Sequence, residues 1–104
     1  MATYRIVQGY DTSGTSLQDY LPGITREALV EAFGSPTRYG YVDDDKGYDG
    51  EEWAFLGDGF ELFTIYSRWG QYRIGGRGAL LFDIPKGVVD FKEYVVKRTG
   101  AKRS

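Results

Sequence analysis

The sequence contains no cysteine and no histidine. Without cysteine no disulfide can form, which excludes a disulfide-stapled secreted scaffold and agrees with a reducing compartment. The same absence removes thiolate nucleophiles, Cys/His zinc sites and the usual general base at neutral pH. We therefore expect a protein that is not an enzyme and that uses no cofactor and no metal.

Long apolar runs are also missing, and the longest clear one extends only from Ala79 to Phe82. The first residues lack the basic-then-apolar pattern of a signal peptide. These observations predict a cytoplasmic protein with no membrane partner. The 104 residues suit one domain and leave no room for a second core, so we expect a single binding domain over 1–104 with a frayed tail at 99–104.

Aromatic residues, by contrast, are abundant at 16% of the chain, and nine of them are tyrosines. Large aromatic side chains bury much area each, so even a small domain can build a core from them. Nine tyrosines are more than such a core needs, and tyrosine also recurs on binding surfaces. The composition favours a binding protein.

Charge is unevenly distributed along the chain, although the formal net charge is only −2. Residues 1–66 carry 12 acids and 4 bases, whereas residues 67–104 carry 3 acids and 9 bases. This asymmetry can produce a basic face suited to phosphates or to an acidic partner. The alternative is that folding mixes the two halves in space.

One helix has strong signals at both ends. Thr25 is a suitable N-cap, and Gly34 followed by Pro36 ends the helix. Between them, Leu29, Val30 and Phe33 have helical spacing and form one apolar stripe. A second helix is expected over 87–98, although its valines and tyrosine would also suit a strand.

The remaining segments alternate between strand and loop signals. Strands are expected at 3–8, 53–56, 60–69, 71–74 and 79–84. Loops are expected at 9–22 and 37–50, and a flexible break at 75–78. The fold class is therefore α+β, with a mostly antiparallel sheet of four or five strands and one or two helices packed on a face.

The turn at Asp58-Gly59 leaves the register of the 53–69 hairpin open. A two-residue turn pairs Trp53 with Thr64, whereas a three-residue turn pairs Trp53 with Phe63. In either register the 60–69 strand is apolar on both faces. One face packs on the first helix, and the other requires residues 87–98 or a second copy of the chain, which favours a homodimer.

Two groups of motifs carry a resemblance to known families. The segment from Pro22 to Thr37 resembles the helix of outer-membrane-assembly lipoproteins and β-lactamase-inhibitor proteins. Together with Trp53, Asp58-Gly59, the strand 63–66 and Ile74-Gly-Gly, it looks closer to small uncharacterised bacteriophage proteins. The resemblance covers residues 20–76 and implies a helix on an antiparallel sheet in a phage accessory protein of the host cytoplasm. Anchoring by a lipobox cysteine does not carry over, because that cysteine is missing.

Three apparent motifs do not indicate a site. The acidic segment 43–52 has the composition of a calcium loop, but its spacing places glycine and leucine at ligand positions, so we expect a solvated acidic loop. Glu51 and Glu52 are adjacent in a strand and point to opposite faces, so they cannot act as a catalytic pair. The glycines of 75–78 lack the Gly-Lys-Ser/Thr ending of a phosphate loop and indicate a bulge or turn.

The stretch from Tyr66 to Arg73 combines aromatic and arginine side chains around Gly70, as many interfaces do. The predicted binding residues are Tyr66, Arg68, Trp69, Tyr72 and Arg73; the alternative is that the aromatics close the sheet edge.

We expect a host-defence antagonist, an inhibitor that neutralises a host protein through protein contacts. The alternatives are a sponge for a nucleotide-type small molecule bound by Arg68, Arg73 and Arg77, and a nucleic-acid-binding protein that uses the basic C-terminal third. A deep pocket with converging arginines would favour the sponge, and a flat apolar patch would favour protein contacts.

Overall fold

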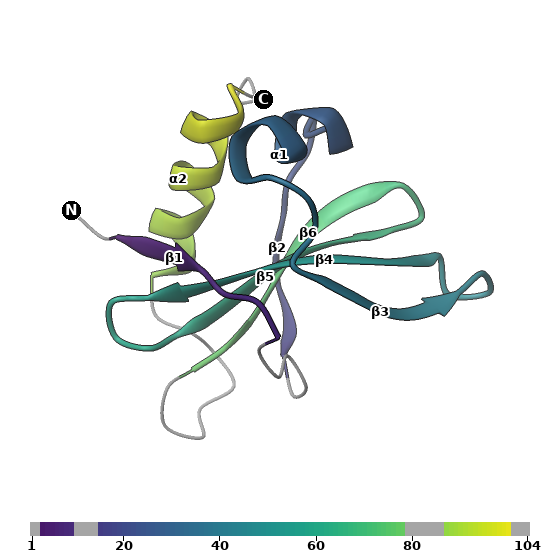
Figure 1. The fold of residues 1–104 in the computed structure, drawn as a ribbon, viewed down its shortest axis with the longest axis horizontal. Coiled ribbons are helices and arrows are strands. Elements are labelled where there is room, and N and C mark those ends of the chain that lie inside the picture. The colour runs from purple at the N-terminus through teal and green to yellow at the C-terminus, as the bar shows by residue number, and fades with distance from the viewer. Residues whose placement is uncertain (1–2, 10–14, 79–86, 101–104) are drawn as a thin grey trace.

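The fold is one antiparallel sheet with two helices on a single face. A computed structural model describes residues 3–9, 15–78 and 87–100 of the chain (Figure 1). The strands are β1 (Tyr4–Ile6), β2 (Ser16–Tyr20), β3 (Arg38–Asp43), β4 (Tyr48–Gly57), β5 (Leu62–Arg68) and β6 (Gln71–Arg77), and the helices are α1 (Arg26–Phe33) and α2 (Val88–Thr99). The strand order is β1-β4-β5-β6-β2, and β3 pairs with the first half of β4. The α+β class is confirmed, but the described residues form six strands where four or five were expected.

Two of these strands lie in segments that were expected to be loops. β2 is a polar edge strand, and its backbone pairs with β6 from Ser16 to Tyr20. β3 and the start of β4 form a hairpin over residues 38–52, and residues 44–47 are its tip. Asp43 stabilises this tip because its Oδ1 accepts hydrogen bonds from the backbone N–H groups of Asp45 (3.0 Å) and Lys46 (3.2 Å).

β6 also differs from its expected length. It continues through Gly75 and Gly76 to Arg77, so the flexible break expected at 75–78 is wrong. The paired neighbours β5 and β2 hold this glycine-containing backbone extended on both sides. The strand expected at 79–84 lies outside the described residues. So does most of the frayed tail expected at 99–104, but its first residue, Thr99, is the last residue of α2.

The first helix forms as expected. The hydroxyl of Thr25 accepts a hydrogen bond from the backbone N–H of Ala28 (3.1 Å), which satisfies one unpaired donor of the first turn. Gly34 ends the helix with a φ of 85°, a value that side-chain-bearing residues rarely adopt. Leu29 and Phe33 are buried and Val30 packs against them, which confirms the apolar stripe.

Both helices cover the same face of the sheet (Figure 1). Phe91 and Val95 of α2 enter the same core as Leu29 and Phe33 of α1. Residues 87–98 therefore do not cover the face of the sheet opposite α1, which was one of the two coverings expected for it. The main core is one cluster of buried side chains: Leu21, Ile24, Leu29, Phe33, Trp53, Phe55, Phe63, Ile65, Tyr72, Ile74, Phe91 and Val95.

The second face of the sheet has a smaller apolar cluster. Ala54, Leu56 and Leu62 are buried there, and Val7 packs against them. Because these side chains are already buried in the single chain, they do not require a second copy to cover them. The homodimer therefore stays a prediction, and the apolar residues of the second face do not support it. Within the described residues, no helix is long and apolar enough to cross a membrane.

The β4–β5 hairpin has a register that differs from both expected ones. Trp53 pairs with Ile65, and Leu56 pairs with Leu62, so the turn contains Asp58, Gly59 and Phe60. Phe60, the third residue of the turn, has a φ of 64°. This left-handed position of a three-residue turn is usually occupied by glycine. A two-residue turn was favoured by Asp-Gly alone, but the burial of Trp53 and Ile65 on the helix side decides the register.

Arg98 joins the two helices, and we expect its removal to destabilise the protein. Its Nη2 donates a hydrogen bond to the backbone oxygen of Ala32 (3.1 Å), and its guanidinium lies 5.4 Å from the ring centre of Phe33. α1 has no basic residue in its own last turn, so Arg98 provides the positive charge at that helix end. Arg98→Ala should lower the free energy of unfolding by about 1–2 kcal/mol in urea denaturation. Lys97→Ala, in the same turn, is the control and should change it by less than about 0.5 kcal/mol; equal effects would contradict this role.

Candidate functional site

The second face carries a group of tyrosine and arginine side chains beside the small apolar cluster. Cross-strand pairing places them together, because residues directly opposite in an antiparallel sheet share a face. Tyr66 of β5 is opposite Arg73 of β6, which is in turn opposite Tyr20 of β2. Tyr48 of β4 is opposite Arg68 of β5. We name these five residues the Tyr–Arg face.

Each arginine of the Tyr–Arg face stacks on a tyrosine. The guanidinium carbon of Arg68 lies 5.2 Å from the ring centre of Tyr48, and that of Arg73 lies 5.1 Å from the ring centre of Tyr20. Arg68 also donates from Nε to the backbone oxygen of Lys46 (2.7 Å). Such contacts hold a guanidinium in place and leave its charge uncompensated.

Neither arginine forms an ion pair within the part of the chain that the structure describes. Two ion pairs of the described residues, Arg26 with Glu51 and Lys92 with Asp19, lie away from the Tyr–Arg face. The pKa of Glu51 is lowered by its hydrogen bond from Arg26. Arg68 and Arg73 are thus positioned cations without a carboxylate partner, which is what an anion-binding surface requires.

Tyr66 lies at the centre of this surface. Its ring is 6.2 Å from that of Tyr48. Burial is the main cause of the raised pKa of the Tyr66 hydroxyl. The nearby Tyr48 raises this pKa further, whereas Arg73 and Arg68 lower it. The groups that influence this hydroxyl are therefore the other members of the Tyr–Arg face.

The structure brings together three of the five predicted binding residues, namely Tyr66, Arg68 and Arg73. Tyr72 lies apart from them: its side chain faces the helices, is only 7% exposed and lies edge-on to Trp53 with ring centres 6.2 Å apart. Burial accordingly raises the pKa of its hydroxyl. Alternation along β6 separates Tyr72 from Arg73 by the thickness of the sheet.

Trp69 lies at the rim of the Tyr–Arg face, in the turn between β5 and β6, and is 63% exposed. Its backbone N–H donates to the backbone oxygen of Gly47 (2.9 Å), which connects the turn to the tip of the β3–β4 hairpin. Tyr20 and Tyr48 were not predicted. Both are distant in sequence from residues 66–73, and only the strand pairing brings them to the arginines.

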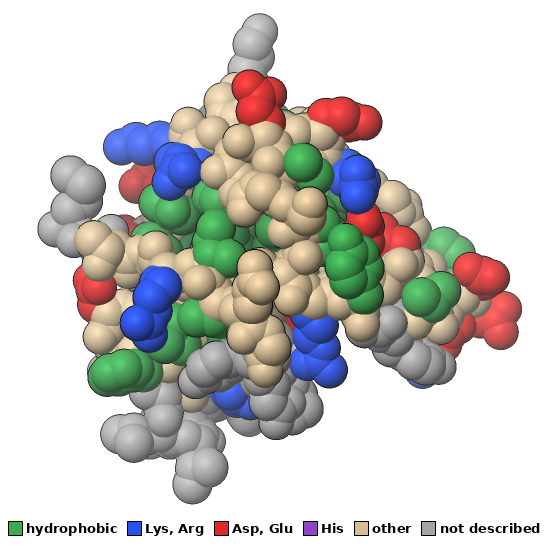
Figure 2. Space-filling view, in the orientation of Figure 1, with side chains coloured by type: hydrophobic (Ala, Val, Ile, Leu, Met, Phe, Trp, Pro, Cys, Tyr) green, Lys and Arg blue, Asp and Glu red, His purple; other side chains and the backbone are tan. Residues whose placement is uncertain are grey.

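The distribution of charge agrees with a basic second face. By register, Arg5, Arg38 and Arg77 lie on the same face as Arg68 and Arg73, where Glu52 and Asp43 are the acids of the paired strand positions. Figure 2 shows a group of acidic side chains at the β3–β4 end of the molecule, with others at the helix end. Folding therefore preserves part of the charge separation seen in the sequence.

Within the described residues, the acids form no metal-holding group, and Glu51 and Glu52 do not converge. Glu51 and Glu52 pair with Tyr39 and Tyr66 respectively, so they point to opposite faces as expected. Within residues 3–9, 15–78 and 87–100, no group of three or more acidic residues is arranged to hold a metal ion.

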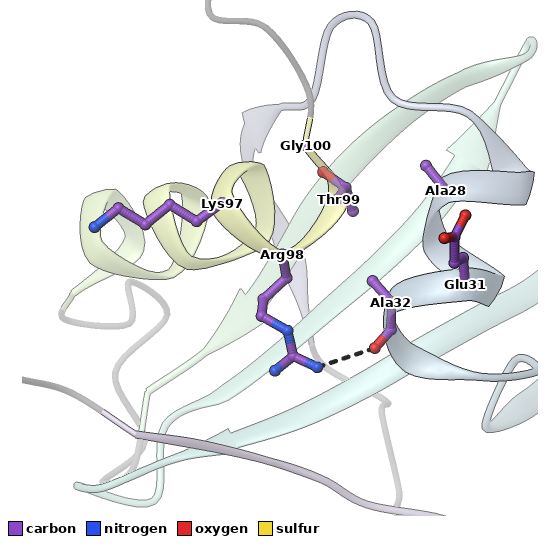
Figure 3. A pocket seen from close by; sticks show the side chains of 7 residues that line it. All are labelled: Ala28, Glu31, Ala32, Lys97, Arg98, Thr99 and Gly100. Atoms are coloured by element: carbon purple, nitrogen blue, oxygen red, sulfur yellow. Dashed lines mark hydrogen bonds between the residues drawn. The ribbon is translucent and has the colours of Figure 1, made fainter.

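A hollow of roughly 440 Å³ separates the ends of α1 and α2 (Figure 3). Arg98 and Thr99 line it, but both are bonded within the protein, Arg98 to Ala32 and the Thr99 hydroxyl to the backbone oxygen of Val95 (2.8 Å). Lys97 points away from α1 (Figure 3). Glu31 also lines the hollow, but it is a single carboxylate with no second free polar group beside it among the described lining residues, so the Tyr–Arg face is the better candidate site.

Comparison of this chain with protein-family models, with curated proteins and with solved structures found no match in any of the three.

Proposed function

We propose that this chain is a non-enzymatic binding protein that captures an acidic partner protein on the Tyr–Arg face. The observation that carries the proposal is the pair of guanidinium groups on neighbouring strands, each stacked on a tyrosine and neither paired with a carboxylate among the described residues. Tyrosine, tryptophan and arginine dominate the binding energy of protein interfaces. The exposed ring of Trp69 at the rim supplies such an anchor.

The proposal includes the role expected from the phage resemblance, namely neutralisation of a host-defence protein in the host cytoplasm. An acidic partner suits the basic second face, because complementary charge accelerates association and disfavours like-charged competitors. Inhibition by this route needs no reactive group, since occupying the partner's surface is sufficient. A second candidate, capture of a nucleotide-type molecule, is favoured by two buried, unbonded donors on the same face, the Thr64 hydroxyl and Nε of Arg73.

The test removes both positioned cations. Arg68→Ala combined with Arg73→Ala should weaken partner binding about 30-fold or more, because truncating an arginine anchor often costs above about 2 kcal/mol. Both side chains are half-buried and stacked on tyrosines, so the variant is expected to lose some stability and to stay folded, which its melting temperature checks. Wild type and variant are immobilised, exposed to bacterial lysate, and compared by mass spectrometry of the proteins retained.

A matched control removes two positive charges elsewhere. Lys92→Ala combined with Lys97→Ala, both on α2 and therefore on the other face of the sheet, changes the net charge equally but leaves the tyrosine-stacked guanidiniums intact. Proteins retained by wild type and by this control, and lost from the Arg68/Arg73 variant, would support the proposal. Equal retention by all three forms would contradict it, and loss from both variants would indicate attraction by net charge alone.

A further inference from the structure

Three buried side-chain atoms of the second face make no hydrogen bond. Thr64 is 0% exposed, and its hydroxyl oxygen is one of them. The Nε atom of Arg73 is the second, and one carboxylate oxygen of Glu52, Oε1, is the third. Polar atoms in protein interiors are nearly always hydrogen-bonded, so three such atoms on one face require a physical explanation.

The register places these groups side by side. Thr64 is opposite Gly75, and the next pair on the same face is Tyr66 opposite Arg73. A Cβ atom at Gly75 would lie 2.5 Å from the Thr64 hydroxyl oxygen and 3.1 Å from Cε1 of Tyr66. The hydroxyl and the tyrosine ring therefore both lie over the bare backbone of Gly75, and any side chain there would displace them.

The chemistry of these groups indicates what they would bind. A threonine hydroxyl and an arginine Nε–H are both hydrogen-bond donors, and the Arg68 guanidinium adds a second positive charge nearby. The carboxylate of Glu52 belongs to β4, on the other side of Tyr66 from Arg73. On the β5–β6 side, donors combined with two positive charges select an oxyanion with more than one negative charge. The rings of Tyr20 and Tyr66 offer flat apolar surfaces on which a planar ring can stack.

We propose that Thr64 and Arg73 form an oxyanion subsite for a phosphorylated nucleoside. The Thr64 hydroxyl and the Arg73 Nε–H donate to phosphate oxygens, Arg68 adds charge, and the base stacks on Tyr20 or Tyr66. The ligand enters from the Tyr20 side, because Tyr20 is 42% exposed and forms the outer edge of this group. This inference rests on the Tyr–Arg face being the binding surface, and it names a small-molecule ligand for that surface.

The test uses Thr64→Val, which replaces the hydroxyl with a methyl group of similar size. Calorimetric titration with ADP, GDP, CDP and UDP should show binding of at least one diphosphate to the wild type. Inorganic phosphate and the matching nucleoside should each bind at least tenfold more weakly, because each provides only half of the contacts. Thr64→Val should weaken diphosphate binding at least tenfold and should raise the melting temperature by a few degrees, because it removes a buried, unbonded hydroxyl.

Thr37→Val is the matched control for stability. The Thr37 hydroxyl accepts a hydrogen bond from the backbone N–H of Ala54 (2.9 Å), so the same substitution should lower the melting temperature there. Arg73→Lys is a second binding variant: it keeps the charge but loses the planar donor, and it should also weaken diphosphate binding at least tenfold.

Three results would overturn the inference: no diphosphate binding to the wild type at millimolar concentration, unchanged affinity in Thr64→Val, or a lower melting temperature in that variant. The last would show that the hydroxyl is bonded in the free protein. Failure here is distinct from failure of the protein-partner proposal. Proteins lost from the Arg68/Arg73 variant in the capture experiment, with no diphosphate bound by the wild type, would leave that proposal intact.

Discussion

Replacing Phe91 with alanine should lower the free energy of unfolding by about 3–5 kcal/mol, a large part of the roughly 5–15 kcal/mol available to a domain of this size. Phe91 is 0% exposed and is the larger of the two α2 side chains, with Val95, that enter the core. Its ring stacks on Phe63 of the sheet with centres 4.5 Å apart, and lies 5.1 Å from Phe55 and 5.2 Å from Tyr4. Alanine would lose these contacts and leave a cavity between helix and sheet.

Urea denaturation followed by circular dichroism measures this effect. Val89→Ala is the control on the same helix, since Val89 is 66% exposed and alanine is the better helix former. We expect that control to unfold within about 0.5 kcal/mol of the wild type. If Phe91→Ala were equally mild, α2 would not be part of the core.

Gly47→Ala is expected to have the second largest effect, about 2–4 kcal/mol of lost stability. Gly47 has a φ of 76°, which side-chain-bearing residues adopt only with strain. A Cβ atom there would also lie 2.4 Å from Cδ2 of Trp69 and 2.7 Å from its backbone nitrogen. The exposed ring could turn away, but the backbone could not move without breaking the Trp69 N–H to Gly47 hydrogen bond of 2.9 Å.

Gly70→Ala separates the two causes of this loss. Gly70 has nearly the same φ, 75°, but a Cβ atom there would meet no neighbour within 4 Å. The control should therefore lose only the cost of the left-handed conformation, about 1–2 kcal/mol. Chemical denaturation followed by tryptophan fluorescence compares the variants, and equal destabilisation would show that the contact with Trp69 contributes nothing.

Gly47→Ala should also disturb the candidate site. Gly47 precedes Tyr48, and Arg68 precedes Trp69, so separating the two hairpin ends would separate the stacked Tyr48 and Arg68. Binding measured on this variant should weaken in parallel with stability. The Tyr–Arg face therefore depends on a glycine that touches no ligand in either proposal.

The sequence by itself determined the elements whose signals are local. α1 was predictable because Thr25 and Gly34 act within one turn of the helix ends, and α2 because Phe91 and Val95 share one helical stripe. Strict alternation along β5 also made it predictable that Tyr66 and Arg68 share a face. The α+β class follows from these elements together.

Only the tertiary structure decided the rest, because the deciding contacts join residues far apart in the chain. β2 exists because β6 supplies its backbone hydrogen bonds, and its own polar side chains give no strand pattern. The hairpin register depended on burying Trp53 beneath the helices rather than on Asp58-Gly59. The candidate site is the clearest case: Arg73 meets Tyr20 across 53 residues of sequence because a sheet places side chains by strand pairing, and pairing is set by the core that all the strands bury together.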